Sequence, residues 1–234
     1  PISANRGVNI DMLVEAIEEH IVAHVERDLD STPLMHVARS FDINSPGTTP
    51  DNLKGGVLGG SLIQGTIKIG DEIEIVPGIK TEVSGKDVYQ RITTKVTSLV
   101  AGGKSVKSVN PGGLISIGTS LDPSITKSDG LTGRMIGVPG HLPAVVHDFN
   151  MKTTLLDRVV GSASDLKVDE IKSNEPLMLS IGTATTVGIV KSGKGGAIQV
   201  VLKIPVCVSE GQRVAISRRI SNKWRLIGYG IVEL

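Results

Sequence analysis

Residues 54–78 read KGGVLGGSLIQGTIKIGDEIEIVPG, and this stretch decides the expected fold. Apolar and polar residues alternate along it, as they do in a strand with one buried face. Two glycine pairs and Gly65 interrupt the alternation, and glycines inside a strand indicate a bend or a bulge. We therefore expect a bent, strongly twisted strand that leads into a hairpin of a small antiparallel barrel. The glycines also leave bare backbone that a ligand or a second chain could approach closely.

The second half of the stretch predicts the direction of four side chains. After a turn at Gly70-Asp71, the alternation places Ile73 and Ile75 toward the interior. It places Glu72 and Glu74 toward water.

Composition sets the class of protein. Of the 234 residues, 39% are apolar and 21% are charged, which is typical of a soluble globular chain with room for two domains. The 28 glycines and 11 prolines indicate many turns and a strand-rich fold. No apolar stretch approaches the roughly 18 residues of a membrane span, and no signal-peptide pattern is present, so we expect a cytoplasmic protein. The single cysteine, Cys207 in IPVCV, is expected to pack as a small hydrophobe in a reducing compartment.

The N-terminal 30 residues predict a linker preceded by one amphipathic helix capped by Asn9. No partner helix is evident, so the helix either packs onto a barrel or belongs to a domain upstream, and a start without Met favours truncation. Its apolar positions recur at helical spacing: Ile10, Leu13, Val14, Ile17 and Ile21.

The rest of the chain predicts two consecutive antiparallel β-barrels, so the fold class is mainly β. We expect a domain boundary in the glycine- and proline-rich segment 130–143, which gives a helix and linker at 1–30, a first barrel at 31–142 and a second barrel at 143–234. A polar segment that leaves the barrel is expected at 79–90. Strands are expected at 34–41, 54–65, 72–75, 91–100, 114–117, 145–160, 177–181, 185–191, 197–208, 213–218 and 224–232.

Motifs for catalysis are weak. GIVKSGKG at 188–195 matches seven positions of a phosphate-binding loop, but Gly195 stands where Ser or Thr should hold magnesium, and a strand pattern follows instead of a helix. We therefore expect a hairpin turn there. His20 and His24 lie four residues apart, but the order HExxH and a third ligand are missing, so we expect a solvated helix end and no metal site. The chain is expected to be a binding module and not an enzyme.

Charge is distributed unevenly along the chain. Residues 1–30 carry two Arg against seven Asp and Glu, whereas residues 191–234 carry eight Lys and Arg against two Glu. The C-terminal cluster predicts either contacts with RNA phosphates or a charged hairpin tip. Alternation along the strand puts Arg218 and Arg219 on opposite faces, so the cluster cannot form one patch. Its members are Arg218, Arg219, Lys223 and Arg225.

Several separated stretches carry a resemblance to a known family. They are PISA at 1–4, ARSFDINSPGT at 38–48, residues 54–78, NPGGLISIGTSLDPSITKSD at 110–129, LLDRVVG at 155–161, IPVCV at 204–208 and VAISRRISNKWRLIGYG at 214–230. With these stretches the chain resembles the gamma subunit of translation initiation factor two, the archaeal form more than the eukaryotic, over nearly its whole length. SFDINSPGT and WRLIGYG fit the related elongation factors less well.

The resemblance implies the architecture of elongation factor Tu, in which a GTP-binding domain precedes two β-barrels. Residues 1–24 then resemble the end of the nucleotide domain, and Ser3 and Ala4 match its guanine-side motif. The phosphate loop, switch regions, base-specificity motif and zinc knuckle have no counterpart. GTP and magnesium are therefore expected in the parent protein, a GTPase, and no cofactor is expected in this chain.

The resemblance also implies partners. The family forms a heterotrimer with an alpha subunit, on the first barrel, and a beta subunit, mainly on the nucleotide domain, and it delivers initiator methionyl-tRNA to the small ribosomal subunit. The alternative is an elongation factor, or a selenocysteine-specific one, that binds another aminoacyl-tRNA. The tRNA acceptor end is expected on the first barrel, at Ser40, Phe41, Asp42, Lys54, Gly55, Gly56, Val57, Gly59, Gly60, Asn110, Pro111, Gly112 and Gly113.

Overall fold

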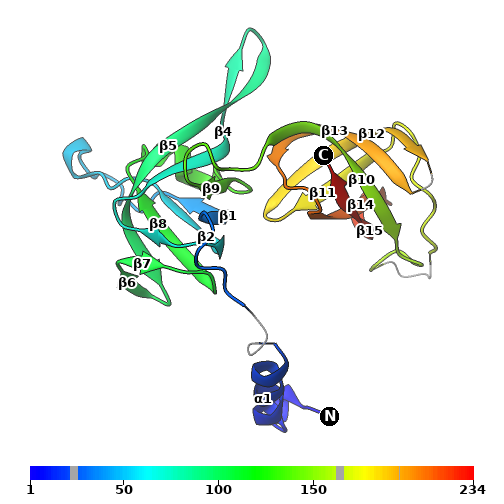
Figure 1. Ribbon diagram of the computed structural model, residues 1–234, viewed down its shortest axis with the longest axis horizontal. Coiled ribbons are helices and arrows are strands. Elements are labelled where there is room, and N and C mark those ends of the chain that lie inside the picture. The colour runs from blue at the N-terminus through cyan, green and yellow to red at the C-terminus, as the bar shows by residue number, and fades with distance from the viewer. Residues whose placement is uncertain (22–25, 162–165, 195) are drawn as a thin grey trace.

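Strands with alternating apolar and polar residues close into two antiparallel barrels that lie side by side (Figure 1). The computed structural model describes residues 1–21, 26–161, 166–194 and 196–234. In the first barrel six strands form a ring in the order β4-β9-β1-β2-β8-β5, and the pairing of β4 with β5 closes it. These strands are β1 (Leu34–Phe41), β2 (Val57–Gln64), β4 (Glu72–Val83), β5 (Lys86–Ala101), β8 (Leu114–Thr119) and β9 (Met135–Gly137). Three short strands lie outside the ring: β3 (Ile67–Lys68) pairs with β7 (Ser108–Val109), and β6 (Lys104–Val106) pairs antiparallel with the end of β5.

The second barrel is a closed ring of six strands in the order β10-β13-β12-β11-β14-β15. Five of its strands begin and end within three residues of the predicted positions, whereas β10, predicted to reach residue 160, ends at Leu155. Along β11 a buried residue occupies every second position. They are β10 (Val145–Leu155), β11 (Pro176–Ile181), β12 (Ala184–Lys194), β13 (Ala197–Cys207), β14 (Arg213–Ile220) and β15 (Lys223–Glu233). The predicted fold class, two consecutive barrels after one helix, is confirmed.

Each barrel has its own apolar core, made of the inward-facing residues of its strands. Met35, Leu58 and Ile117 are fully buried in the first core, and Leu177, Leu179 and Ile216 in the second. Ile73 and Ile75 face the first core as the alternation predicted. The fold therefore follows from period-two patterning in both halves of the chain.

Two β-bulges interrupt the pairing of the glycine-rich strand β2 with β1. The register shifts between Val37 and Arg39, where β1 has one extra residue opposite Gly59 and Gly60, and between Leu34 and Met35, where Ile63 of β2 is the extra residue. A bulge bends the strand that carries it and increases the local twist. The bulge in β2 supports the predicted bend of this strand.

Glu74 was predicted to face water, and that prediction is wrong. The residue is only 8% exposed. Its carboxylate lies 3.5 Å from the guanidinium of Arg91 and accepts a hydrogen bond of 3.2 Å from the Gly140 amide. Arg91 of β5 and the segment that follows β9 thus lie against a side chain that local alternation marks as exposed.

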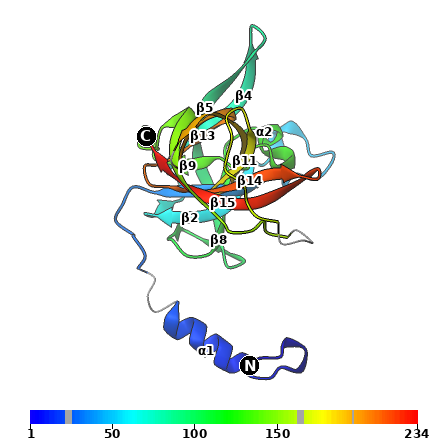
Figure 2. The same ribbon diagram turned by 90° about the vertical axis from the view of Figure 1, so that its right-hand side faces the viewer.

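The polar segment predicted at 79–90 is instead the outer part of a long hairpin. β4 and β5 stay paired from Ile79 opposite Gln90 to Val83 opposite Lys86, and the hairpin projects from the barrel as an arm (Figure 2). Arg134 supports the base of this arm: its Nε donates to the Gly78 carbonyl at 2.8 Å, and its guanidinium lies 5.7 Å from the centre of the Tyr89 ring.

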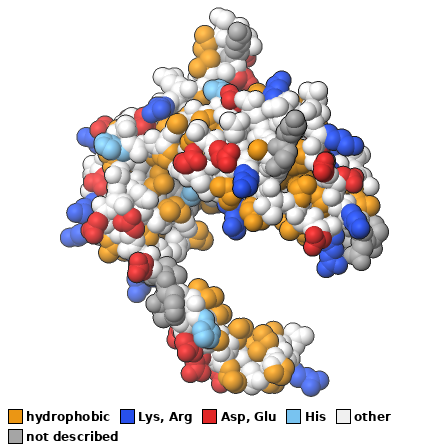
Figure 3. Space-filling view, turned by 45° about the vertical axis from the view of Figure 1, so that its right-hand side comes forward, with side chains coloured by type: hydrophobic (Ala, Val, Ile, Leu, Met, Phe, Trp, Pro, Cys, Tyr) orange, Lys and Arg blue, Asp and Glu red, His pale blue; other side chains and the backbone are white. Residues whose placement is uncertain are grey.

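The N-terminal segment contains a short 3-10 helix, η1 (Ala4–Arg6), and the helix α1 (Ile10–His20). No residue of α1 is buried, and the helix stands apart from both barrels, with hydrophobic side chains gathered on it (Figure 3). Asn9 does not cap it, contrary to prediction: the residue adopts a left-handed conformation, and its Nδ2 donates to the Pro1 carbonyl at 2.9 Å. None of the helices in the described residues is long and apolar enough to span a membrane.

A small apolar cluster joins the two barrels. It contains Val76 and Met135 from the first barrel and Cys207 from the second. The Cys207 thiol donates to the Pro143 carbonyl at 3.0 Å, and burial raises its pKa to about 12. Cys207 thus packs as a small hydrophobe, as predicted. The limits proposed for the domains remain a prediction.

Candidate functional site

The glycines of residues 54–65 serve the packing of the barrel. A Cβ on Gly55 would lie 1.9 Å from the Thr119 carbonyl oxygen, and one on Gly60 would lie 1.9 Å from that of His36. A Cβ on Gly56 would lie 2.3 Å from Thr126 Oγ1. Gly59 differs, because a Cβ there would meet nothing closer than 3.7 Å. Three of these four glycines are therefore required by their own neighbours.

A groove of about 710 Å³ opens at the end of the barrel where β2 begins. Val57 lies opposite Phe41 of β1 on one side and Gly118 of β8 on the other, so this end brings together the loop after β1, the start of β2 and the segment after β8. The groove is lined by Ile43, Leu53, Lys54, Gly55, Val57, Thr97, Ser98, Gly118, Thr119, Ser120, Leu121, Asp122 and Pro123.

The walls of the groove are mixed in character. Ile43 and Leu53 are 49% and 45% exposed and supply apolar surface, while Thr97, Ser98 and Ser120 supply hydroxyl groups. Such a combination suits a ligand with one apolar or aromatic part and one hydrogen-bonding edge. Within the described residues, no group of three His, Cys, Asp or Glu side chains is placed to hold a metal ion.

Opposite charges lie on the two sides of the groove. Lys54 is exposed on one side. Asp122 on the other caps the short helix α2 (Pro123–Thr126), and its carboxylate accepts the Ser124 amide at 2.8 Å. Hydrogen bonding to the side chain of Ser124, together with that to its amide, lowers the pKa of Asp122 below its ordinary value, so the carboxylate is charged at neutral pH.

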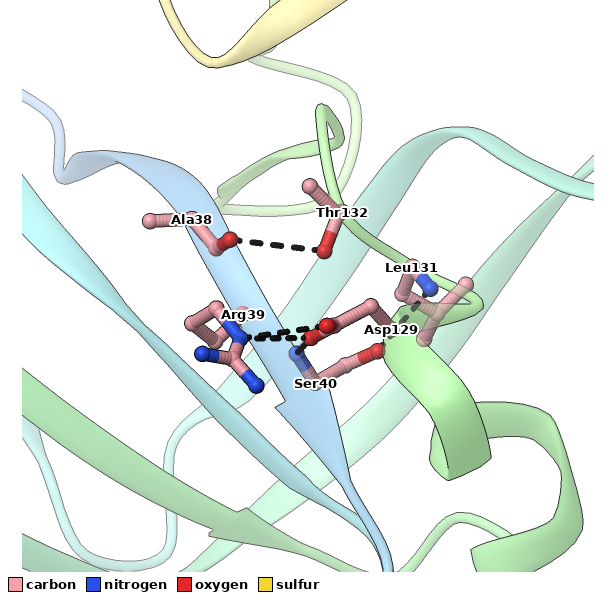
Figure 4. A network of polar contacts seen from close by, with 6 residues as sticks. All are labelled: Ala38, Arg39, Ser40, Asp129, Leu131 and Thr132. Carbon is pink, nitrogen blue, oxygen red and sulfur yellow. Dashed lines mark hydrogen bonds and ion pairs between the residues drawn. The ribbon is translucent and has the colours of Figure 1, made fainter.

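Ser40 was predicted as a binding residue, but its side chain is buried and hydrogen-bonds within the protein. It is 1% exposed, and its Oγ accepts the Leu131 amide at 3.0 Å. Its own amide donates to Asp129, whose carboxylate also binds Arg39 Nε at 2.9 Å (Figure 4). Thr132 Oγ1 donates to the Ala38 carbonyl in the same network. These contacts clamp the segment that contains η4 (Lys127–Asp129) along β1.

The predicted acceptor-end set is divided between the two ends of β2. Asp42, Lys54 and Gly55 lie at the groove end, whereas the turn Asn110–Gly113 precedes β8 and lies near Ser61, which pairs with Leu114. At about 3.4 Å per residue, β8 separates that turn from Gly118 by roughly 17 Å. The antiparallel pairing of β2 with β8 is the reason, and the structure therefore does not bring the turn together with the groove.

Other contacts engage this turn. Thr66 Oγ1 donates to Asn110 Oδ1 at 2.9 Å, and Pro111 is buried. The guanidinium of Arg27 lies against Gly112, 3.0 Å from where a Cβ would stand. Of the remaining predicted residues, Gly56, Gly59 and Gly60 are buried in β2 or just before it, and Phe41 is half-buried at the end of β1.

The basic residues of the second barrel do not lie together on one face. Arg218 is held inside: its side chain is 16% exposed, it pairs with Glu175, and its guanidinium donates to the carbonyls of Asp169 and Glu170 at 2.9 and 3.0 Å. Arg219 faces outward and donates to Asn222 at 2.9 Å. Two members remain near the hairpin tip: Lys223 is exposed, and Arg225 is half-buried.

The remaining sequence motifs come together in no site among the residues that the structure describes. Ser3 exchanges backbone hydrogen bonds with Val8, and Ala4 is exposed at the start of η1. Residues 188–194 continue β12, and position 195 lies outside the described residues, as does His24. Sequence reasoning missed the groove residues of β5, Thr97 and Ser98, because no local signal shows which strand ends meet.

Comparison with known proteins identifies relatives of the whole chain. Family models match at residues 55–130, "Elongation factor Tu domain 2", and at residues 147–232, "Initiation factor eIF2 gamma, C terminal". The chain is 54% identical over 233 residues to translation initiation factor 2 subunit gamma of Methanothermobacter thermautotrophicus, covering all of this chain and 57% of that protein. It is 55% identical to the same subunit of Archaeoglobus fulgidus, covering 54% of it. The chain thus spans little more than half the length of these relatives.

Solved structures show the same fold at low identity. A bacterial selenocysteine-specific elongation factor matches 98% of this chain with a TM-score of 0.72 and 20% identity, over 32% of its own length. The elongation factor SelB of Methanococcus maripaludis, solved with a GTP analogue, matches all of it with a TM-score of 0.73 and 18% identity, over 50% of its own length.

Proposed function

Because the chain belongs to the gamma-subunit family of translation initiation factor 2, archaeal in type, we propose that the groove at the start of β2 binds the aminoacylated acceptor end of initiator tRNA. The observation that carries this proposal is the groove itself. It lies beside Lys54–Val57, where the family resemblance places the acceptor end, and it combines apolar, hydroxyl and cationic side chains.

The terminal nucleotide of a tRNA offers groups that match these walls. A purine has two apolar faces, which Ile43 and Leu53 would cover, and polar ring edges, which the hydroxyls of Ser98 and Ser120 would meet. The ammonium group of Lys54 would bind a phosphate of the single-stranded end. No bond is made or broken by these contacts, so the groove acts by binding and orienting.

For the whole protein we propose GTP-dependent delivery of initiator methionyl-tRNA to the small ribosomal subunit, in a complex with alpha and beta subunits. The alpha subunit docks on the first barrel. GTP, magnesium and most of the beta contact belong to the parent's nucleotide domain, of which Ser3 and Ala4 are a part. Arg219, Lys223 and Arg225 contribute contacts to RNA phosphates, whereas the internal pairing of Arg218 argues against a direct part for it.

Binding of a methionylated acceptor-stem minihelix tests the groove. We expect Lys54→Ala to weaken binding roughly tenfold at low salt and to reduce the salt slope by about one, as for the loss of one phosphate contact. Lys68→Ala in β3 is the matched control, because Lys68 is also exposed but lies outside the groove. Equal affinity of the wild-type chain and Lys54→Ala, or no binding by the wild-type chain, would contradict the proposal.

Two further measurements separate the alternatives. Competition between initiator and elongator tRNA distinguishes an initiation factor from an elongation factor, and the high identity to gamma subunits favours the former. Isothermal titration with the alpha subunit and with GTP should show binding of alpha by this chain. Tight GTP binding without alpha binding would overturn the assignment of these roles.

A further inference from the structure

The side chain of Asn44 closes the neck of the loop between β1 and β2. Its Nδ2 donates to the Lys54 carbonyl at 2.7 Å, and its Oδ1 accepts the Lys54 amide, also at 2.7 Å. Its Nδ2 and its backbone amide both reach Asp42 Oδ1, at 2.7 and 2.8 Å. One carboxamide therefore joins two residues that are ten positions apart.

This contact continues the β1–β2 ladder beyond its last backbone pair. In an antiparallel pair, two residues exchange an N–H···O bond in each direction, and the Asn44 amide makes the same exchange with the Lys54 backbone. The last backbone pair is Phe41 with Val57. Without Asn44, the ten residues between positions 43 and 54 would be held mainly by the 3-10 helix η3 (Pro50–Asn52) and local turns.

The neck of this loop lies beside the groove. Ile43 precedes Asn44, while Leu53 and Lys54 stand on the other strand of the neck, and all three line the groove. Asn44 does not line it. It fixes the backbone of residues that do.

We propose that Asn44 is a positioning residue for the acceptor-end groove: by clamping the Lys54 backbone it holds Ile43, Leu53 and Lys54 as a preformed wall. This inference rests on the proposed function. A wall that is formed only part of the time lowers the apparent affinity by the fraction of time it is formed, so loss of the clamp appears as weaker binding without loss of the fold.

The chemistry of the clamp requires both a donor and an acceptor. In Asn44→Asp the carboxylate still accepts the Lys54 amide, but it cannot donate to the Lys54 carbonyl, and it stands against the carboxylate of Asp42. When protonated, the carboxyl group introduced by this substitution regains one donor and one acceptor in the original shape. Asn44→Ala lacks both at any pH.

The experiment compares minihelix binding by the 234-residue chain and three variants at pH 7.5 and pH 5. We expect Asn44→Ala and Asn44→Asp to bind about tenfold more weakly at pH 7.5, the loss expected for one or two hydrogen bonds. The neighbouring Asp42 carboxylate raises the pKa of the introduced carboxyl group and so protonates part of it at pH 5. We therefore expect Asn44→Asp to recover part of its affinity at pH 5 relative to the wild-type chain, and Asn44→Ala to show no recovery. Asn52→Ala is the control, because Asn52 lies in the same loop and its Nδ2 donates to Thr49 Oγ1 within that loop.

Amide hydrogen exchange gives a second reading that needs no ligand. The Lys54 amide should exchange faster in Asn44→Ala than in the wild-type chain, while the amides of β1 and β2 keep their protection. Unchanged exchange at Lys54, or wild-type affinity of both Asn44 variants, overturns the proposal. If the wild-type chain fails to bind the minihelix while the exchange result holds, the clamp stands and the proposed ligand is wrong.

Discussion

Replacing Gly60 by alanine tests whether β2 needs its glycine for packing. The new Cβ would lie 1.9 Å from the His36 carbonyl oxygen and 3.0 Å from the Met35 side chain. Both contacts are with the neighbouring strand β1, so no rotation of the added methyl group relieves them. β1 and β2 would have to separate locally by more than about 1 Å to reach ordinary van der Waals distance.

The cost follows from what that separation breaks. The shift disturbs the pairing around Val37 opposite Gly60, where about two ladder hydrogen bonds at roughly 1 kcal/mol each are at stake. Overpacking of the adjacent core adds about 1–3 kcal/mol. The lower entropy of the unfolded alanine chain returns about 0.4–1 kcal/mol. We expect a net loss of about 3 kcal/mol in the free energy of unfolding, or roughly 6–12 °C in Tm for a chain of this size.

Urea unfolding followed by circular dichroism, with calorimetry for Tm, measures this loss. Gly59→Ala is the matched control on the same strand, since its nearest neighbours would lie at an ordinary 3.7 Å, and we expect it to stay within about 0.5 kcal/mol of the wild-type chain. A stability of Gly60→Ala equal to that of Gly59→Ala would refute the packing argument. The bare backbone at Gly60 would then be free to serve a ligand.

Three further predictions concern charged and titrating groups. Hydrogen bonds from Arg39 and Ser40 lower the pKa of Asp129 below its ordinary 3.8. The stabilising contribution of the ionised carboxylate is therefore present above pH 3.8 and is lost as the pH falls below that value. The stabilities of the wild-type chain and Asp129→Asn, measured in an acid titration, should differ most at neutral pH and converge in acid. Arg218→Ala should destabilise the second barrel by about 3 kcal/mol, because it removes the ion pair of the mostly buried Glu175 carboxylate. The control Arg219→Ala should change the free energy of unfolding in urea by less than about 0.5 kcal/mol. Equal effects of the two substitutions would contradict the inward placement of Arg218. Burial raises the pKa of the Cys207 thiol to about 12, so the thiol should react with a disulfide reagent at pH 8 only when the chain unfolds. Rapid reaction of the folded chain would show that the apolar cluster between the barrels admits solvent.

The barrels were predictable because apolar and polar residues alternate along their strands. The errors occur where a distant part of the chain contacts residues that this pattern marks as exposed. In the second barrel every expected strand is present, although the one expected to reach residue 160 ends at Leu155. Glu74 carries the local pattern of a solvent-facing residue, yet the segment after β9 returns from a distant part of the chain and lies against its carboxylate. The arm at 79–90 has few apolar residues, and it is stabilised by cross-strand pairing, which composition does not reveal.

The binding residues were harder to predict than the fold, since a site depends on which strand ends meet. The start of β2 and the turn before β8 both have bare glycines, and both were expected in one site, but antiparallel pairing puts them at opposite ends of the sheet. Thr97 and Ser98 enter the groove from β5, whose sequence gives no hint of this position. Ser40 lies close to the site in sequence and in space, but its side chain points into the protein.

The close approach of backbone at Gly55 and Gly56 therefore shapes the groove, which Gly55 also lines. Gly55 lets β2 begin against the Thr119 carbonyl, and the Gly56 carbonyl accepts the Thr119 hydroxyl at 2.7 Å. These contacts hold residues 119–123 beside Lys54, so that two segments far apart in the sequence become the two sides of one groove. A larger residue at Gly55 would push those sides apart before it touched any ligand. The glycines thus contribute to binding through the position of their neighbours, and substitutions there should change affinity and stability together, whereas Lys54→Ala should change affinity alone.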